Sequence, residues 1–333
     1  MDEPLFLRSV SALNPMKRSK AAYRILSLAL MTAGICWVLY LLSGTLTNPI
    51  LLLPTSWPWF GVASLLVILA TAANGLLFYL FLRIEGKKSY PLFLTLKMHY
   101  SAQLLRYLPG RLWGIAYQIG VTKEHIPALR IARANLDWMI FSLVGSSLIA
   151  VLLIGYKQDW SFFLLTISAL FGSVSIALIF LGGSNSIFNI LVSIFPEKIQ
   201  NTLRGFNETR ISPIQLALIG GIFILSWTLY LSGWILLWKV FPIFQDVDLI
   251  TLCAYYTLAS VLGIVSAITP AGLGVRESTF IILASGNWET EVIGFFAVFG
   301  RIWLMVLEIA TLLIFFCIYA LMNRFYDENA SKL

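Results

Sequence analysis

The chain of 333 residues is too apolar for a soluble domain, because 59% of its residues are hydrophobic, only 12% are charged, and its mean hydropathy is +0.85. Soluble domains carry about 25% charged residues, so we expect an all-α polytopic membrane protein. The net charge of +7 is explained by basic cytoplasmic loops that face anionic lipid, and no nucleic-acid partner is expected.

Six segments are long and apolar enough to cross a bilayer as helices, which takes about 20 residues. The first follows a basic leader and is interpreted as an uncleaved span, because no convincing signal-peptide cleavage site follows it. The predicted spans are 22–42, 60–82, 134–155, 161–182, 215–239 and 292–320.

The distribution of Lys and Arg predicts the orientation of these spans. Of the 23 basic residues, 19 can be assigned to one side. That side is expected to be cytoplasmic, because cytoplasmic loops are enriched in Lys and Arg. Six full crossings then place both termini in the cytoplasm, and we expect the cytoplasmic (inner) membrane as the location.

Two further segments, at about 91–120 and 249–286, each carry a Pro-Gly break in the middle. Proline ends a helix because it lacks the amide donor, and glycine allows unusual dihedrals and close backbone approach. We expect each segment to form a re-entrant helical hairpin, the first open to the cytoplasm and the second to the outside. The break residues are Pro109 and Gly110 in the first segment and Pro270, Gly272 and Gly274 in the second.

The order of span, hairpin and span therefore occurs twice, in opposite orientations. Pro109 and Pro270 are 161 residues apart, and Arg133 and Arg301, which open the following helices, are 168 apart. Inverted repeats with broken helices are a recurring transporter design. We expect one membrane domain over 1–333, with the leader and first span at 1–59, a first repeat with an extra span at 60–182, and an amphipathic segment with a second repeat at 183–333.

Charged residues in the helix after each hairpin are candidate binding residues. Asp137 follows Arg133 by four residues, and Glu308 follows Arg301 by seven, so each pair shares one helix face. Burying such a pair costs desolvation, which favours a functional role. The alternatives are a structural pair that fixes helix rotation or, for Arg133, an arginine that reaches the interface.

Arginines also lie beside the breaks. Arg106, Arg111 and Arg276 offer donors suited to phosphate, and amides freed at a break can add an anion site. Glu277 is expected to balance Arg276, or to hold a cation or a proton. The alternative is that Pro and Gly only kink the helices, with Arg106 and Arg111 at headgroup level.

The chain lacks the sequence patterns of a phosphate-binding loop, a metal-ligand cluster or a nucleophilic serine elbow. We therefore expect no catalytic residues, no metal, no cofactor and no enzymatic activity.

Three motifs, Leu108–Trp113 (LPGRLW), Thr269–Glu277 (TPAGLGVRE) and Phe299–Trp303 (FGRIW), carry a family resemblance. With them the chain resembles the transmembrane, flippase-like domain of lysylphosphatidylglycerol synthases, over about residues 20–325. The resemblance implies movement of lipids with charged or glycosylated headgroups between leaflets. The aminoacyl-transferase domain of the bifunctional members is not in this sequence, so lysyl transfer is not expected.

The function expected is translocation of a phospholipid or polyprenyl-phosphate-linked headgroup through a polar cleft. Arg111, Arg276 and Arg301 would capture the phosphate, and Glu277, Asp137 and Glu308 would balance charge or accept an amine or proton. The alternatives are a secondary transporter of a small anion, a membrane-embedded transferase, or a non-catalytic component of an envelope lipid or polysaccharide synthesis complex. The expected partners are the membrane lipid and either envelope-synthesis enzymes or a second copy of the chain.

Overall fold

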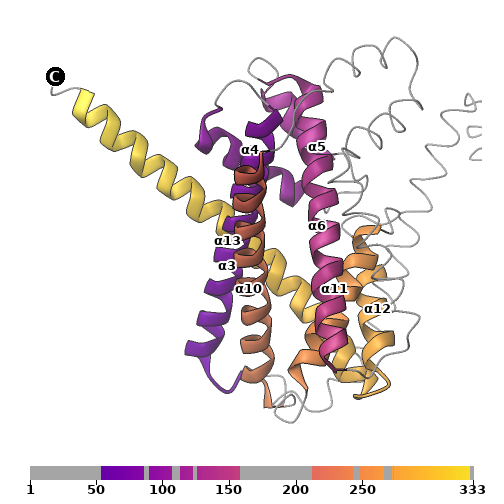
Figure 1. Ribbon diagram of the computed structural model, residues 1–333. Helices are drawn as coiled ribbons and strands as arrows, with labels where there is room; N and C mark the ends of the chain where they lie inside the picture. Colours follow the sequence, from indigo (N-terminus) through magenta and orange to yellow (C-terminus); the bar gives the residue numbers. More distant parts are fainter. Residues whose placement is uncertain are drawn as a thin grey trace, which may run out of the picture.

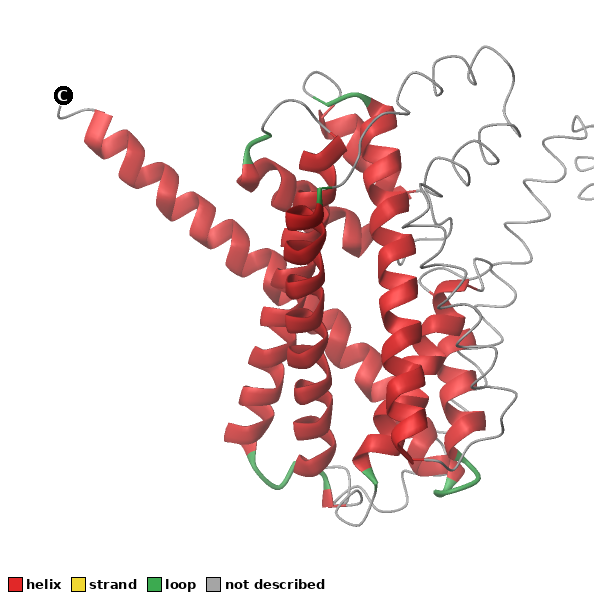
Figure 2. Ribbon diagram, viewed as in Figure 1, coloured by secondary structure: helices red, strands yellow, loops and turns green. Residues whose placement is uncertain are grey.

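The described part of the chain is helical throughout (Figure 2). The computed structural model describes residues 54–85, 90–106, 113–122, 126–157, 212–242, 248–265, 272 and 274–330. The predicted spans 22–42 and 161–182 lie outside these residues, as do Pro109, Gly110, Arg111 and Pro270.

Four long helices form the frame of the molecule (Figure 1). Each contains a window with a mean hydropathy between 1.9 and 2.5 and is long enough to cross a membrane, which agrees with the four predicted spans in this part of the chain. The helices extend beyond the predicted limits by a few residues at most ends, and by ten residues at the end of the last. They are α3 (Trp57–Glu85), α6 (Ala128–Lys157), α10 (Pro213–Val240) and α13 (Thr290–Ala330).

Four shorter helices form two contacting pairs, at the places where hairpins were predicted. With 10 to 17 residues, each is too short to cross a bilayer, which takes about 20. In Figure 1 one pair lies at the upper end of the long helices and the other at the lower end. The first pair is α4 (Leu92–Leu105) with α5 (Trp113–Thr122), and the second is α11 (Leu249–Val265) with α12 (Val275–Ala284).

Helices α3 and α10 run antiparallel and make the most extensive helix contact. Thr55, just before α3, donates from its backbone amide and its hydroxyl to the carbonyl of Val240 at the end of α10, both at 2.8 Å. Midway along, Asn74 Nδ2 donates to Ser226 Oγ at 2.9 Å, and Gly233 lets α10 approach Val67 closely. Small and hydroxyl-bearing residues at a contact are typical of helices that pack in lipid.

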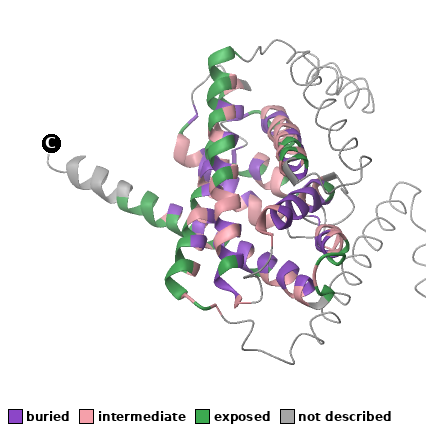
Figure 3. Ribbon diagram, turned by 60° about the horizontal axis from the view of Figure 1, so that its bottom comes forward, coloured by how far each residue is buried: buried purple, intermediate pink, exposed green. Residues whose placement is uncertain are grey.

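Each long helix that follows a short pair packs against the other short pair. Helix α6 lies on α11, and α13 lies on α4 as well as on α12. Figure 3 shows the buried residues where the helices meet, while apolar side chains such as Leu152 and Ile224 are 71% and 66% exposed. Exposed apolar side chains of this kind suit a lipid environment. Because α6 packs on α11 and α13 packs on both α4 and α12, the two short pairs belong to one bundle.

Candidate functional site

Two glycines with left-handed backbone conformations precede α12. Gly272 has φ +70° and Gly274 φ +84°, in the region that disfavours any residue with a Cβ. A Cβ on Gly272 would lie 2.8 Å from the carbonyl oxygen of Gly263 in α11, and a Cβ on Gly263 would lie 3.1 Å from the Arg276 Cβ. The prediction that Gly272 and Gly274 allow unusual dihedrals is confirmed, and Gly272 also makes the predicted close approach.

Glu277 joins the start of α12 to α13. Its Oε2 accepts a hydrogen bond of 2.8 Å from the Gly274 amide, which has no partner within the helix. Its Oε1 lies 3.9 Å from Arg301 Nε, and both side chains are buried, with 7% and 8% exposed. Glu277 was expected to balance Arg276 or to hold a cation or a proton; among the described residues its ion pair is with Arg301 of α13.

Arg276 has aromatic neighbours. Its guanidinium lies 4.3 Å from the centroid of the Tyr256 ring and donates to Tyr230 Oη at 3.2 Å. The two tyrosine hydroxyls are themselves 3.2 Å apart. Within the described residues Arg276 contacts no carboxylate, so its positive charge has only polar and cation–π partners.

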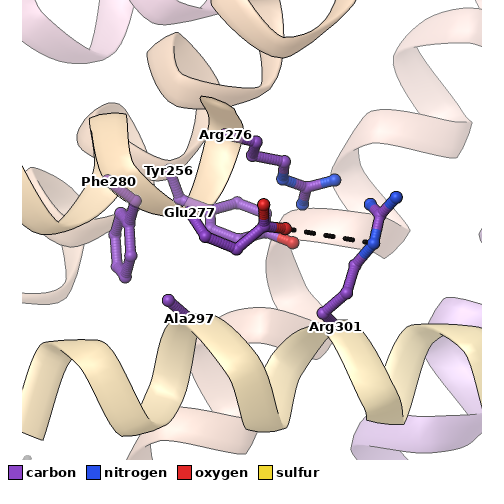
Figure 4. A pocket seen from close by; sticks show the side chains of 6 residues that line it. All are labelled: Tyr256, Arg276, Glu277, Phe280, Ala297 and Arg301. Atoms are coloured by element: carbon purple, nitrogen blue, oxygen red, sulfur yellow. Dashed lines mark ion pairs between the residues drawn. The ribbon is translucent and has the colours of Figure 1, made fainter. Parts of the chain in front are cut away.

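A cavity opens beside these groups at the junction of α11, α12 and α13. Its free space is about 10 Å³, which is enough for about one water molecule. Figure 4 shows the guanidinium groups of Arg276 and Arg301 facing the same space beside the Glu277 carboxylate. The lining residues of the cavity are Tyr256, Arg276, Glu277, Phe280, Ala297 and Arg301.

The end of α4 carries a second charged contact with α13. Arg106, the residue that caps α4, forms an ion pair with Glu308 and donates to Gln103 Oε1 at 2.6 Å. Gln103 Nε2 is 3.1 Å from His99 Nε2. The His99 ring is buried and stacks on Phe78 with centroids 4.7 Å apart. These contacts tie the α4–α5 pair to α13.

One face of α13 thus contacts both short pairs. Arg301 and Glu308 are seven residues apart, which is about 10.5 Å along a helix, and they share one face as predicted. Arg301 is directed at Glu277 in α12 and Glu308 at Arg106 in α4. Helix α13 therefore carries a basic contact toward one pair and an acidic contact toward the other.

Arg133 and Asp137 form a separate ion pair within α6. Arg133 Nε lies 3.7 Å from Asp137 Oδ2, with the arginine side chain only 2% exposed. The prediction that these residues can pair on one face is confirmed, but neither lines the cavity beside Arg276. A nearby polar contact joins α5 to α6, where Asn135 Nδ2 donates to Gln118 Oε1 at 2.6 Å.

Sequence reasoning missed the aromatic side of the site. Tyr230 and Tyr256 come from α10 and α11, where they lie in apolar runs that predict packing alone. Gln103 was also missed, because it carries no charge, although its spacing of three residues from Arg106 places the two on one helix face. These uncharged side chains belong to the site because the fold places them beside an arginine, which the sequence alone does not show.

No protein-family model matches the chain, and no curated protein or solved structure shows a significant similarity to it. The resemblance to the flippase-like domain therefore stays a prediction. Support for a function has to come from the site itself.

Proposed function

We propose that this protein moves the headgroup of a phospholipid or polyprenyl-phosphate-linked lipid across the membrane, and that Arg276 and Arg301 bind its phosphate. The observation that carries the proposal is that these two arginines lie beside the Glu277 carboxylate where α11, α12 and α13 meet, inside an apolar bundle. Arginine side chains brought together in this way are suited to bind phosphate.

The cost of this arrangement supports a functional reading. An arginine within a membrane helix costs about 2.5–3.5 kcal/mol on insertion scales, and such residues mark substrate and ion pathways. Arg276 offsets that cost only with Tyr230 and Tyr256 among the described residues. A purely structural arginine gains more from a carboxylate than from a phenol, so a ligand is the stronger explanation for its charge.

The arrangement of the helices supports a pathway with two openings. We propose that the α4–α5 and α11–α12 pairs are re-entrant hairpins of an inverted repeat, opening from the cytoplasm and from the outside. Their placement at opposite ends of the long helices (Figure 1) and the packing of α6 on α11 and of α13 on α4 support this. Six spans, cytoplasmic termini and the inner membrane belong to the same proposal, as does the likeness to the flippase-like domain.

In this proposal the lipid tails stay in the bilayer while the headgroup crosses. Extracting a chain would cost about 0.8 kcal/mol per methylene, whereas a headgroup can exchange water for the arginines of the cleft. Arg276 and Arg301 hold the phosphate, with Arg111 as a further donor. Glu277 and Glu308 balance charge or accept an amine.

Reconstitution in liposomes with fluorescent lipids tests the function. Labelled phosphatidylglycerol and a labelled polyprenyl-phosphate sugar are followed by quenching of the outer leaflet. Wild-type protein is expected to speed leaflet exchange of at least one of them, and Arg276→Gln to slow it about tenfold, since about 1.4 kcal/mol of lost binding is a factor of ten. Arg83→Gln, at the exposed end of α3, is the matched control and is expected to match wild type.

A small soluble anion is the rival substrate, because a pair of arginines such as Arg276 and Arg301 can bind a free phosphate as well as a lipid phosphate. The same liposomes loaded with radiolabelled inorganic phosphate distinguish the two. Counterflow of phosphate without lipid exchange would replace the lipid proposal with an anion transporter. Equal lipid exchange in wild type and Arg276→Gln would remove the site from the mechanism.

A further inference from the structure

We infer that the start of α12, which carries Arg276 and Glu277, is a gate and that the structure shows this gate closed. The space beside Arg276 and Arg301 holds about one water molecule, so a phosphate group, which is larger than water, enters only after α12 and α13 separate. Opening breaks the contact between Glu277 and Arg301, and the phosphate replaces the carboxylate beside Arg301. This inference rests on the proposed function and specifies how its site is reached.

One end of the α12–α13 pair is held by packing. There α12 ends at Ala284 and α13 begins at Thr290, so a turn of a few residues joins them. In this turn Asn287 Nδ2 donates to Tyr255 Oη of α11 at 2.7 Å. Ala284 and Ile293, on either side of the turn, are fully buried in the apolar core. The turn end of the pair is therefore anchored to the rest of the bundle.

The other end of the pair, where α12 starts, carries charged side chains instead. Glu277 Oε1 is 3.9 Å from Arg301 Nε, which is longer than the roughly 2.7–3.2 Å of an N–H···O hydrogen bond. Glu277 lies seven residues before the last residue of α12, Ala284, which is about 10.5 Å along the helix. A small rotation about the turn therefore moves the start of α12 away from α13 while the turn end stays packed.

Glu277 moves with α12 when the gate opens. Its Oε2 accepts a hydrogen bond of 2.8 Å from the Gly274 amide at the start of the same helix, so the carboxylate leaves Arg301 instead of following it. Taking the partner away from a buried charge is costly. A lipid phosphate that enters beside Arg301 offsets this cost, so the gate opens more readily with substrate than without it.

Arg276 becomes available in the same movement. In the closed state its guanidinium lies 4.3 Å from the centroid of the Tyr256 ring in α11 and donates to Tyr230 Oη in α10 at 3.2 Å. The hydrogen bond to Tyr230 joins α12 to α10, so it weakens when the start of α12 moves. Figure 4 shows that the guanidinium already faces the space beside Arg301. A hydrogen bond to phosphate is stronger than one to a phenol, because both partners are charged.

Thiol labelling of a cysteine in the wall of the space tests the gate. Ala297 lines the space from α13 and is only 7% exposed. Ala297→Cys is placed in a background in which Cys36, Cys253 and Cys317 are replaced by alanine. The protein is held in lipid nanodiscs, where both faces are accessible, and treated with a charged, water-soluble methanethiosulfonate reagent. The labelling rate then measures how often the gate opens.

Removing the charged contact is expected to speed the labelling. Glu277→Gln keeps an oxygen that accepts the Gly274 amide but loses the charge that faces Arg301. It is expected to raise the labelling rate of Ala297→Cys about tenfold, which corresponds to about 1.4 kcal/mol. Arg301→Gln removes the other partner and is expected to act in the same direction. The matched control is Gly286→Cys, at an exposed position in the turn with nothing within 4 Å of an added Cβ, where labelling should be fast and unaffected by either substitution.

The outcomes separate the gate from the function on which it depends. If Ala297→Cys reacts as fast as Gly286→Cys, or if neither Glu277→Gln nor Arg301→Gln changes its rate, the gate is refuted, while lipid exchange in liposomes is a separate measurement of the function. If labelling speeds up as expected but wild type moves no lipid, the movement of α12 stands and the proposed function falls. Should one variant fail to elute as a folded protein in size-exclusion chromatography, the other still decides, because both remove the same contact.

Discussion

Replacing Gly272 by alanine tests whether the connection into α12 holds the site in shape. The backbone of Gly272 has φ +70°, a conformation that L residues adopt at a cost. The new Cβ would also lie 2.8 Å from the Gly263 carbonyl oxygen and 3.1 Å from the Gly263 Cα. Both neighbouring atoms belong to the backbone of α11, so neither can move aside like the end of a flexible side chain.

The size of the effect follows from these two contributions. The left-handed conformation costs about 1–2 kcal/mol for a residue with a Cβ, and overpacking costs about 1–3 kcal/mol. We therefore expect the free energy of unfolding to fall by about 2–5 kcal/mol, unless α12 moves away from α11. Such a movement would displace Arg276, which packs on Gly263, so lipid exchange should fall even where the protein stays folded.

Stability is measured by unfolding in mixed micelles and function by leaflet exchange in liposomes. Gly221→Ala is the matched control, because a Cβ there has nothing within 4 Å and no positive φ, and alanine is favoured by about 0.5–1 kcal/mol inside a helix. The reasoning is refuted if Gly272→Ala is as stable and as active as Gly221→Ala. Loss of stability with full activity would show that the connection matters for folding alone.

Two further predictions concern the contacts of α13. A double-mutant cycle with Arg106→Gln and Glu308→Gln is expected to give a coupling energy of about 0.5–3 kcal/mol in unfolding experiments, and a value near zero would show that the ion pair contributes nothing. Gly300→Ala would overlap the indole ring of Trp234 and should destabilise the protein by about 1–3 kcal/mol, whereas an unchanged unfolding midpoint would mean that α10 and α13 can separate freely.

The sequence predicts the long helices of this fold well, because an apolar run of 20 or more residues has few alternatives in a membrane protein. The spans predicted at 60–82 and 215–239 lie within α3 and α10, which extend beyond them by one to three residues. The short helices are also predicted, since Pro and Gly interrupt the apolar runs. What remains a proposal is that the two pairs are re-entrant hairpins of an inverted repeat, and from which side of the membrane each enters.

The partners of the charged residues were harder to predict. Helical spacing shows that Arg133 and Asp137 share a face and pair within α6, because that contact is local. Spacing also places Arg301 and Glu308 on one face, but it does not say which helices lie opposite. Those partners depend on how the helices pack in three dimensions, and neighbours such as Glu277 were assigned to the nearest charge in sequence.

The two charged contacts of α13 differ from each other. Arg106 forms an ion pair with Glu308, whereas Arg276 contacts two tyrosines, Tyr230 and Tyr256. If Arg276 binds the phosphate as proposed, phosphate binding should be lost in Arg276→Gln and largely retained when Arg106 and Glu308, which already pair with each other, are neutralised together.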